Sequence, residues 1–398
     1  MLSTKNVAHL KMRIILCGLL CSIQWLCCSL VVAEVLLEGQ SAGMSFRVEK
    51  VAQGLGVPWG MTFLKPSEII ITERSGKLKL LRLASKSQTL ATVTTLSGLP
   101  SIKVVGQGGL LDVAVPPDFV PGDWIYFTYS KSHTDGAVTT LARAKRDGLQ
   151  LKQWTELLVT RSATDTGYHF GSRITFDDNG HVFFTVGDRG VRPNGQDLTT
   201  HAGSVLRLNR DGSVPTDNPF ANNSKSSSAG LPEIWSYGHR NPQGLAYDYL
   251  NKRLWMIEHG PRGGDEINLI RPGLNYGWPV ISYGKEYWGP FHVGESTHKA
   301  GMEQPVKYYV PSIAPGSLIV YSGRAFPQWK GDLFAGALKL THINRVTLDK
   351  QGQAIAEERL LKGLDERVRA IAESPEGWLY FSTDSGLILR LRPDKNTH

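Results

Sequence analysis

The feature that most constrains this 398-residue chain is a strand pattern that recurs about six times, at spacings of roughly 40 to 70 residues. Each copy begins with an apolar or glycine-rich strand and a polar turn, and an alternating strand that ends in a polar cluster follows. We expect the first strands of the copies at residues 59–63, 110–115, 174–176, 244–247, 318–321 and 369–372. We expect their partners at residues 69–72, 124–129, 182–186, 254–257, 332–335 and 378–382.

Such a repeat predicts the blades of a propeller. A small twisted sheet cannot bury both of its faces alone, so neighbouring sheets stack around an axis until the ring closes. Nothing along the chain has the length and periodicity of a long amphipathic helix. We therefore predict one all-β domain over residues 34–398, a six-bladed β-propeller of four-stranded antiparallel blades. The Gly-, Pro- and Ser-rich segments at 190–235 and 280–315 are expected to form loops over one face of the ring, where a propeller keeps its binding site.

The first 33 residues differ from the rest of the chain. Lys5, Lys11 and Arg13 precede an apolar run over residues 14–32 that ends in small residues. This pattern predicts a cleaved signal peptide at residues 1–33 and a periplasmic or secreted protein, with an uncleaved anchor as the alternative. All four cysteines lie within this leader (Cys17, Cys21, Cys27, Cys28). The mature chain is therefore expected to contain no disulfide, cysteine-ligated zinc or cysteine nucleophile.

Charge and composition narrow the classes of function. Hydrophobic residues make up 41% and charged residues 20% of the chain, which is typical of a folded globular protein. The net charge of +8 is spread along the sequence, with no arginine-rich run or basic helix. This distribution argues against nucleic-acid binding and favours a basic cleft for a small anionic ligand.

Common catalytic templates are absent from the sequence. It has no phosphate-binding loop that ends in Gly-Lys-Ser, no nucleophile elbow and no paired-histidine zinc helix. The glycine-rich segment 106–109 precedes an expected strand rather than a helix, so it does not indicate a dinucleotide site.

Polar strings instead occupy matching places in successive copies. They are YHFG at 168–171, GDRG at 187–190, GHRNPQG at 238–244, EHGP at 258–261, DEIN at 265–268 and NYGWP at 275–279, followed by Lys339 and RVR at 367–369. Equivalent positions of the blades converge at one mouth of a propeller channel, so we expect these side chains to meet there.

The strings GHRNPQG, EHGP…DEIN and NYGWP, in this order, together with DGSVPTDNPF at 211–220, resemble the soluble quinoprotein glucose and aldose sugar dehydrogenases. The resemblance covers about residues 45–393 and is closer to the compact aldose dehydrogenases, because the loops are short. It implies an oxidoreductase that oxidises the C1 hydroxyl of aldoses to lactones with pyrroloquinoline quinone (PQQ) and calcium.

The resemblance also implies a role for individual residues. His169 would be the general base, and Asp188 would orient its imidazole. Arg240 and Asn241 would contact the quinone carbonyls, where Arg240 would stabilise the developing oxyanion. The further cofactor-binding residues would be Gln107, Lys339, Arg367 and Arg369, since the three carboxylates of PQQ need basic partners.

Two calcium sites follow from the same resemblance. The backbone carbonyls of Gly260 and Pro261 would bind the calcium ion that contacts the quinone, because a hard cation prefers oxygen ligands. Glu266 and Tyr276 match positions of a second, structural calcium. Asp265 either orients the calcium loop or caps a turn.

Other interpretations compete with this one. His201, His239 and His259 are interpreted as hydrogen-bonded structural residues. A calcium-dependent lactonase-type propeller would need a metal held by side-chain carboxylates and asparagine, and a non-catalytic secreted propeller would need no such site. The expected partners are an aldose and an external electron acceptor, without nucleic acid or stable membrane insertion. The preferred sugar stays open, because the loop at 283–292 matches no family pattern. The sequence also leaves open the electron acceptor, the source of PQQ, the number of calcium ions and the choice between monomer and homodimer.

Overall fold

The computed structural model describes residues 34–83, 90–221 and 230–394. The predicted signal peptide at residues 1–33 lies outside the described residues. Strands form almost all of the regular structure, and the helices of the described ranges are two short 3-10 turns, η1 (Arg192–Gln196) and η2 (Pro327–Trp329). Within these ranges, no helix has the length and apolar character needed to span a membrane.

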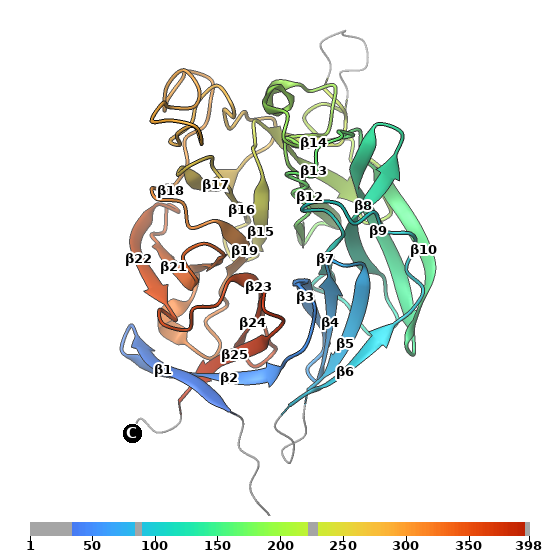
Figure 1. The fold of residues 1–398 in the computed structure, drawn as a ribbon, viewed down its shortest axis with the longest axis vertical. Coiled ribbons are helices and arrows are strands. Elements are labelled where there is room, and N and C mark those ends of the chain that lie inside the picture. The colour runs from blue at the N-terminus through green and yellow to red at the C-terminus, as the bar shows by residue number, and fades with distance from the viewer. Residues whose placement is uncertain (1–33, 84–89, 222–229, 395–398) are drawn as a thin grey trace, which may run out of the picture. The chain divides into compact units, whose positions relative to one another are not determined.

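The strands form six antiparallel sheets arranged around a centre (Figure 1). The first two sheets are β3 (Pro58–Lys65), β4 (Glu68–Glu73), β5 (Lys77–Arg82) and β6 (Thr92–Leu96), then β7 (Leu110–Ala114), β8 (Ile125–His133), β9 (Gly136–Asp147) and β10 (Gln150–Val159). The next two are β11 (Ile174–Phe176), β12 (His181–Val186), β13 (Ser204–Asn209) and β14 (Ile234–Tyr237), then β15 (Pro242–Asp248), β16 (Arg253–Glu258), β17 (Asp265–Ile270) and β18 (Lys307–Tyr309). The fifth is β19 (Pro315–Val320), β20 (Leu333–Ala337), β21 (His342–Leu348) and β22 (Ala354–Leu360).

The sixth sheet closes the ring. It contains β23 (Val368–Glu373), β24 (Leu379–Thr383) and β25 (Ile388–Pro393) from the end of the chain, and β2 (Met44–Ala52) and β1 (Val35–Ser41) from its beginning. Strand β2 pairs with β25, which places Phe46 opposite Pro393. The sequence predicted six four-stranded blades, and this fold class is confirmed; the fifth strand of the last blade was not expected.

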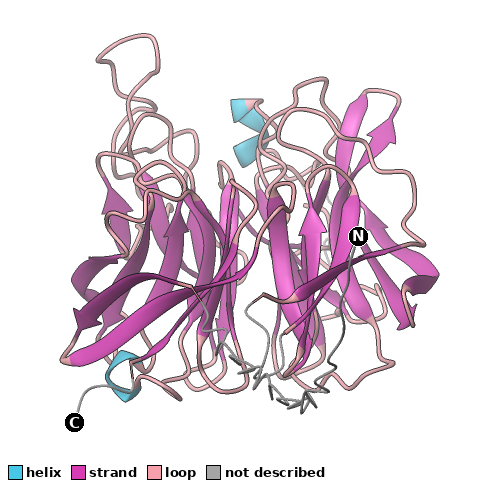
Figure 2. Ribbon diagram, turned by 60° about the horizontal axis from the view of Figure 1, so that its bottom comes forward, coloured by secondary structure: helices cyan, strands magenta, loops and turns pink. Residues whose placement is uncertain are grey.

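The first strand of each blade lies innermost. Strands β3, β7, β11, β15, β19 and β23 contact one another in this order, and β23 contacts β3 again. Apolar side chains of neighbouring blades pack between the sheets; for example, Ile70 and Leu80 share a buried cluster with Phe127. Long loops rise from one side of this arrangement (Figure 2), as the Gly-, Pro- and Ser-rich segments predicted.

A single arginine links the six inner strands. Arg173 is 5% exposed and immediately precedes β11. Its Nε donates to the carbonyl of Gln243 in β15 at 2.9 Å, and its Nη1 donates to Asp112 Oδ1 in β7 at 3.0 Å. Its Nη2 donates to the carbonyls of Gly316 in β19 and, at 3.0 Å, Arg369 in β23. The guanidinium carbon lies 3.9 Å from the ring centroid of Trp59 in β3.

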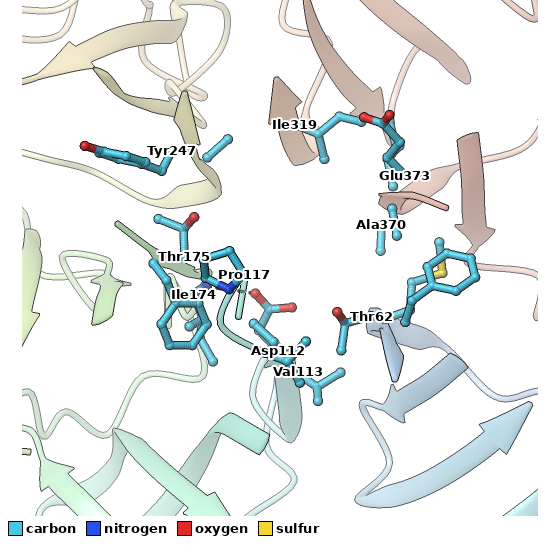
Figure 3. Close-up of a pocket in the computed structure, with 18 of the residues that line it drawn as sticks. Thr62, Asp112, Val113, Pro117, Ile174, Thr175, Tyr247, Ile319, Ala370 and Glu373 are labelled. Atoms are coloured by element: carbon cyan, nitrogen blue, oxygen red, sulfur yellow. Dashed lines mark hydrogen bonds between the residues drawn. The ribbon is translucent and has the colours of Figure 1, made fainter. Parts of the chain in front are cut away.

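Arg173 lines one of two central cavities, and it contacts Trp59, which lines the other. A cavity of about 570 Å³ is lined by Arg173 itself and by residues such as Asp112, Ile174 and Ala370 (Figure 3). None of the predicted site residues lines this larger cavity. The second cavity, of about 230 Å³, lies beyond Trp59, and its lining contains several of the predicted residues.

Candidate functional site

The smaller cavity brings together side chains that are far apart in the sequence. Four of the predicted cofactor-binding residues line it: Gln107, Asn241, Arg367 and Arg369. The lining also contains residues to which the sequence assigned no cofactor role, among them Trp59, Arg74, Gln243 and His259. Trp59 and Gln243 lie near the start of the inner strands β3 and β15, and Arg74 and His259 directly follow the second strands β4 and β16. Equivalent places in different blades are the sequence signal that could have found them.

His169 and Asp188 meet beside this cavity. His169 lies before β11 and Asp188 follows β12, so neighbouring strand ends bring them together. His169 Nδ1 lies 2.6 Å from Asp188 Oδ1, and the imidazole is 14% exposed. Asp188 also accepts hydrogen bonds from Trp278 Nε1 at 2.7 Å and from the amide of Gly190 at 2.8 Å. With Nδ1 donating to this fixed carboxylate, Nε2 of a neutral His169 keeps its lone pair to accept a proton.

The backbone around this pair is closely packed. A Cβ atom on Gly187 would lie 2.4 Å from the carbonyl oxygen of His169, so only glycine fits there. His169 itself has a φ of 51°, which is left-handed and unfavourable for a residue with a side chain. Its amide donates to Gln107 Oε1 at 2.9 Å. One side of the Gln107 amide therefore supports His169, which leaves its NH₂ group for a ligand.

The electrostatic surroundings favour a neutral imidazole. Burial lowers the pKa of His169 below its ordinary value, and the positive charges of Arg240 and Arg189 lower it further. The hydrogen bond and charge of Asp188 oppose this shift without reversing it. A neutral imidazole at neutral pH is the form that a general base requires.

Arg240 and Asn241 are neighbours in the sequence that line different cavities: Asn241 lines the cavity with Arg367 and Arg369, whereas Arg240 lines a small cavity beside Glu258. The Arg240 amide donates to Glu258 Oε2 at 2.6 Å, and its Nη1 donates to the carbonyl of His259 at 3.3 Å. The guanidinium carbon lies 5.4 Å from the ring centroid of Trp278. Asn241 Oδ1 accepts a hydrogen bond from the amide of Gly171 at 3.3 Å, which directs the side chain toward the cavity lining.

Arg367 and Arg369 form a basic cluster with one counter-charge. Arg367 Nε donates to Asp384 at 2.8 Å, and Arg369 Nε and Nη2 donate to the same carboxylate at 2.9 Å. Their two charges hold the pKa of Asp384 below its usual value although burial acts in the opposite sense. The sequence analysis did not anticipate Asp384, whose negative charge reduces the net charge of Arg367 and Arg369 from +2 to +1.

Lys339 differs in position from the other predicted residues. Its side chain is exposed and does not line the cavity, whereas its neighbour Leu338 does. Arg74 adds a positive charge to the lining instead.

The turn at Gly260 and Pro261 is shaped by a buried carboxylate. Asp265 Oδ1 accepts the amide of Gly260 at 2.9 Å, and Oδ2 accepts Ser312 Oγ at 2.6 Å and the amide of Ala314 at 2.9 Å. Among the described residues, the carbonyls of Gly260 and Pro261 accept no hydrogen bond. Of the two roles considered for Asp265, this geometry favours orientation of the loop.

A third cavity, much smaller than the other two, is lined by the carboxylates of Glu258 and Glu266. Glu258 and Glu266 face each other across β16 and β17, and Asn268 Nδ2 lies 3.4 Å from both side chains. Burial and the charge of Glu258 raise the pKa of Glu266 well above its ordinary value. Asn268 Oδ1 is buried without a hydrogen-bond donor. Glu258 and Asn268 lie in the strings EHGP and DEIN, but the sequence analysis gave them no role.

Tyr276 lines this cavity with its ring. Its hydroxyl donates to the carbonyl of Leu269 at 2.6 Å and accepts the amide of Arg271 at 2.9 Å, so these bonds occupy it. The ring stacks on His239 at 4.8 Å. A metal contact by Tyr276 would therefore come from its backbone.

The three histidines that were interpreted as structural are hydrogen-bonded within the fold. His201 bonds with Glu233, and His239 bonds with Ser236 and Glu258. His259 donates through Nε2 to the carbonyl of Pro315 at 2.6 Å, and burial lowers its pKa to about 3. His259 therefore lines the cavity that contains Arg367 and Arg369 as a neutral side chain. Within the described ranges, no group of three or more His, Cys, Asp or Glu side chains is arranged to hold a metal ion.

Comparison with known proteins identifies the family. The family model described as Glucose / Sorbosone dehydrogenase matches residues 55–390. The chain is 38% identical over 362 residues to Aldose sugar dehydrogenase YliI of Escherichia coli (strain K12), covering 89% of this chain and 94% of the relative. It is 28% identical over 422 residues to Quinoprotein glucose dehydrogenase B of Acinetobacter calcoaceticus, covering 86% of each chain.

A solved structure agrees with these matches. The crystal structure of the apo-form of the soluble aldose sugar dehydrogenase from Escherichia coli superposes with a TM-score of 0.81 at 36% identity, covering 88% of this chain and all of that one (100%). The chain that carries the histidine–aspartate pair and the basic cavity therefore belongs to the glucose/sorbosone dehydrogenase family, as its sequence strings predicted.

Proposed function

We propose that this protein oxidises the C1 hydroxyl of aldose sugars to lactones, with PQQ as the hydride acceptor and calcium as a second cofactor. The observation that carries the proposal is a buried imidazole–carboxylate pair, His169 and Asp188, beside a cavity lined by Arg367 and Arg369. A base next to an anion-binding cavity suits a reaction that removes a proton and a hydride from one substrate.

The residues of the chain supply the proton chemistry. His169 Nε2 takes the proton of the C1 hydroxyl, and Asp188 stabilises the imidazolium that forms. Trp278 holds the second oxygen of Asp188, so the carboxylate cannot rotate away. When bound, PQQ would supply the hydride-accepting group, and calcium would supply Lewis-acid chemistry.

The lining of the cavity fits an anionic, planar cofactor. Arg74, Arg367 and Arg369 provide three positive charges against the one negative charge of Asp384. The forked guanidinium groups match carboxylates in geometry as well as in charge. Gln107 and Asn241 add amide groups for carbonyl oxygens. Lys339, which is exposed, would contribute to binding from the rim.

The predicted calcium ligands fit a hard cation. The carbonyls of Gly260 and Pro261 have no other partner among the described residues, and Arg240 lies against the neighbouring His259. Glu258, Glu266 and the unpartnered oxygen of Asn268 would supply oxygen ligands for a second calcium ion. Its charge would offset the repulsion between the two buried carboxylates.

The same proposal covers location and partners. The leader at residues 1–33 supports export to the periplasm or beyond the cell, and electrons would leave to an external acceptor. A lactonase-type hydrolase is less well supported, because it has no need for the arginines Arg367 and Arg369 that line the cavity.

Reconstitution tests the proposal directly. The purified protein is freed of metal and then supplied with PQQ, calcium and a panel of aldoses, and the reduction of an electron-accepting dye is measured. We expect turnover only when both PQQ and calcium are present, together with a rise in melting temperature on binding. An unchanged melting temperature and no turnover with any aldose would refute the dehydrogenase assignment.

Replacement of one cavity arginine is expected to weaken cofactor binding. In Arg369→Gln, the Kd for PQQ should rise by roughly 10- to 100-fold, because a charge-assisted hydrogen bond contributes about 1.5–3 kcal/mol. Titration calorimetry measures this Kd, and Arg324→Gln, an exposed arginine away from the cavity, provides the control. Equal affinity in both variants would place the cofactor elsewhere.

The pH dependence should report the histidine–aspartate pair. Because Asp188 raises the pKa of His169, Asp188→Asn is expected to move the acid limb of kcat/KM to lower pH. The variant should also have a lower plateau, because its imidazolium loses the carboxylate. A profile of kcat/KM between about pH 4 and 9 measures both effects. An acid limb that moves to higher pH would show that another group controls the proton transfer.

A further inference from the structure

Arg189 is a buried cation without an ion-pair partner among the residues that the structure describes. Its side chain is 0% exposed, and the neighbouring carboxylate of Asp188 pairs with His169 instead. Burial lowers the pKa of Arg189 to about 10, which leaves the guanidinium charged at neutral pH. Burying a charge costs several kcal/mol unless other groups compensate it, so the contacts of this side chain indicate why it is retained.

The contacts of Arg189 lie on both sides of His169. Nη1 donates to the carbonyl of Tyr168, the residue before the histidine. The guanidinium carbon lies 3.4 Å from the ring centroid of Phe170, the residue after it. Nη2 donates to the carbonyl of Ala137 at 3.2 Å and so anchors the group to β9 of the neighbouring blade.

The backbone of Arg189 is held in return. Its φ of 58° is left-handed, and its carbonyl accepts hydrogen bonds from Thr164 Oγ1 at 3.2 Å and Thr166 Oγ1 at 2.5 Å. The segment that carries His169 and the segment that carries Asp188 are therefore bonded to each other in both directions. This matters because His169 has a φ of 51°, a conformation that costs roughly 1–2 kcal/mol.

We infer that Arg189 is a positioning residue for the general base: it fixes residues 168–170 so that the imidazole of His169 stays on Asp188. The inference rests on the proposed role of His169 in proton transfer. Only arginine suits this place, because its planar fork can bond two carbonyls while it stacks on an aromatic ring. Its charge also favours the neutral imidazole that a base requires.

The test compares Arg189→Gln with a matched variant. Arg207 is also buried, at 4% exposed, and stacks on Trp235 at 4.5 Å, but it lies near the far end of β13 and bonds with Asn218 and Asp217. Arg207→Gln therefore removes a buried, stacked arginine from the same blade without touching the His169 segment. Arg189→Lys keeps the charge but loses the fork and gives a milder, better-folding variant.

Two measurements are made on each folded protein. Proton NMR of the cofactor-free protein follows the low-field Nδ1–H signal of the bond to Asp188, assigned by its loss in His169→Gln. Dye-linked kinetics with PQQ and calcium give kcat and KM. In Arg189→Gln we expect the NMR signal to broaden or vanish and kcat to fall by about 10- to 100-fold, because a small misplacement of a reacting group has this effect. KM and the rise in melting temperature on PQQ binding should stay unchanged.

The controls separate the possible causes. Arg207→Gln should be destabilised and still keep its signal and kcat, and Arg189→Lys should lie between Arg189→Gln and wild type. The inference is overturned if Arg189→Gln, or Arg189→Lys where the former does not fold, keeps the signal and the wild-type kcat. An equal loss of kcat in Arg207→Gln would overturn it as well. If the wild type oxidises no sugar, the NMR comparison alone decides whether Arg189 positions the imidazole.

Discussion

His169→Gln is expected to lower kcat for aldose oxidation by roughly 10²- to 10⁴-fold, the contribution typical of a positioned general base. Glutamine keeps a hydrogen-bonding side chain of similar length but cannot take a proton at neutral pH. His169 does not line the cofactor cavity, so the Kd for PQQ should change little. Stopped-flow kinetics under single-turnover conditions measure the chemical step without product release.

Two controls make this result specific. The increase in melting temperature with PQQ and calcium should persist in His169→Gln, since the cofactor residues are unchanged. In His169→Ala, added imidazole should restore part of the rate, because the free base can occupy the space left by the side chain. A kcat within tenfold of wild type would mean that another group takes the proton, and the neutral His259 in the cavity wall would then be the next candidate.

Arg173→Met is expected to lower the free energy of unfolding by about 3–5 kcal/mol, because it leaves the buried carboxylate of Asp112 without its partner. The carbonyls of Gln243 and Gly316 also lose their hydrogen-bond donor. Urea unfolding followed by tryptophan fluorescence measures the change. A lower melting temperature should accompany it.

The loss of stability should depend on how exposed the ion pair is, rather than on the distance between its atoms. The matched variant is Arg192→Met, which removes a bidentate pair with Glu286 at 2.7 Å. The Arg192 side chain is 44% exposed, so its loss should cost less than about 1 kcal/mol. The double variant Arg173→Met, Asp112→Asn should recover the part that is due to the unpaired charge. Equal losses in the two single variants would contradict the role of Arg173 as the link between the blades.

The sequence predicted the fold well because each blade repeats the same local pattern. Alternating strands with polar ends are visible in any one copy, and stacking explains why all six must pack together. The pairing of β2 with β25 was missed for a physical reason. It joins residues such as Lys50 and Leu389, and no local pattern shows which distant edge a strand will complete.

The site was predicted less completely. Gln107, Asn241, Arg367 and Arg369 do line one cavity, but the resemblance also suggested Lys339, which is exposed outside its lining. Asp384 was missed because it stands in a short polar turn that resembles any other hairpin. Arg189 lay within a selected string, yet nothing in the sequence distinguishes a buried arginine from a solvated one. Such roles depend on which side chains converge, and only the tertiary arrangement determines that.

The closure of the ring has a consequence for how the protein is made. The chain leaves the ribosome from its N-terminus, so β1 and β2 emerge first and wait for β25, the last strand to be synthesised. Until residues 388–393 are available, the edge of β2 that pairs with β25 stays unpaired. A product truncated before Ile388 therefore lacks the pairing that joins the two ends of the chain in the sixth sheet. In such a product the edge of β2 stays exposed, where proteases and chaperones can bind it.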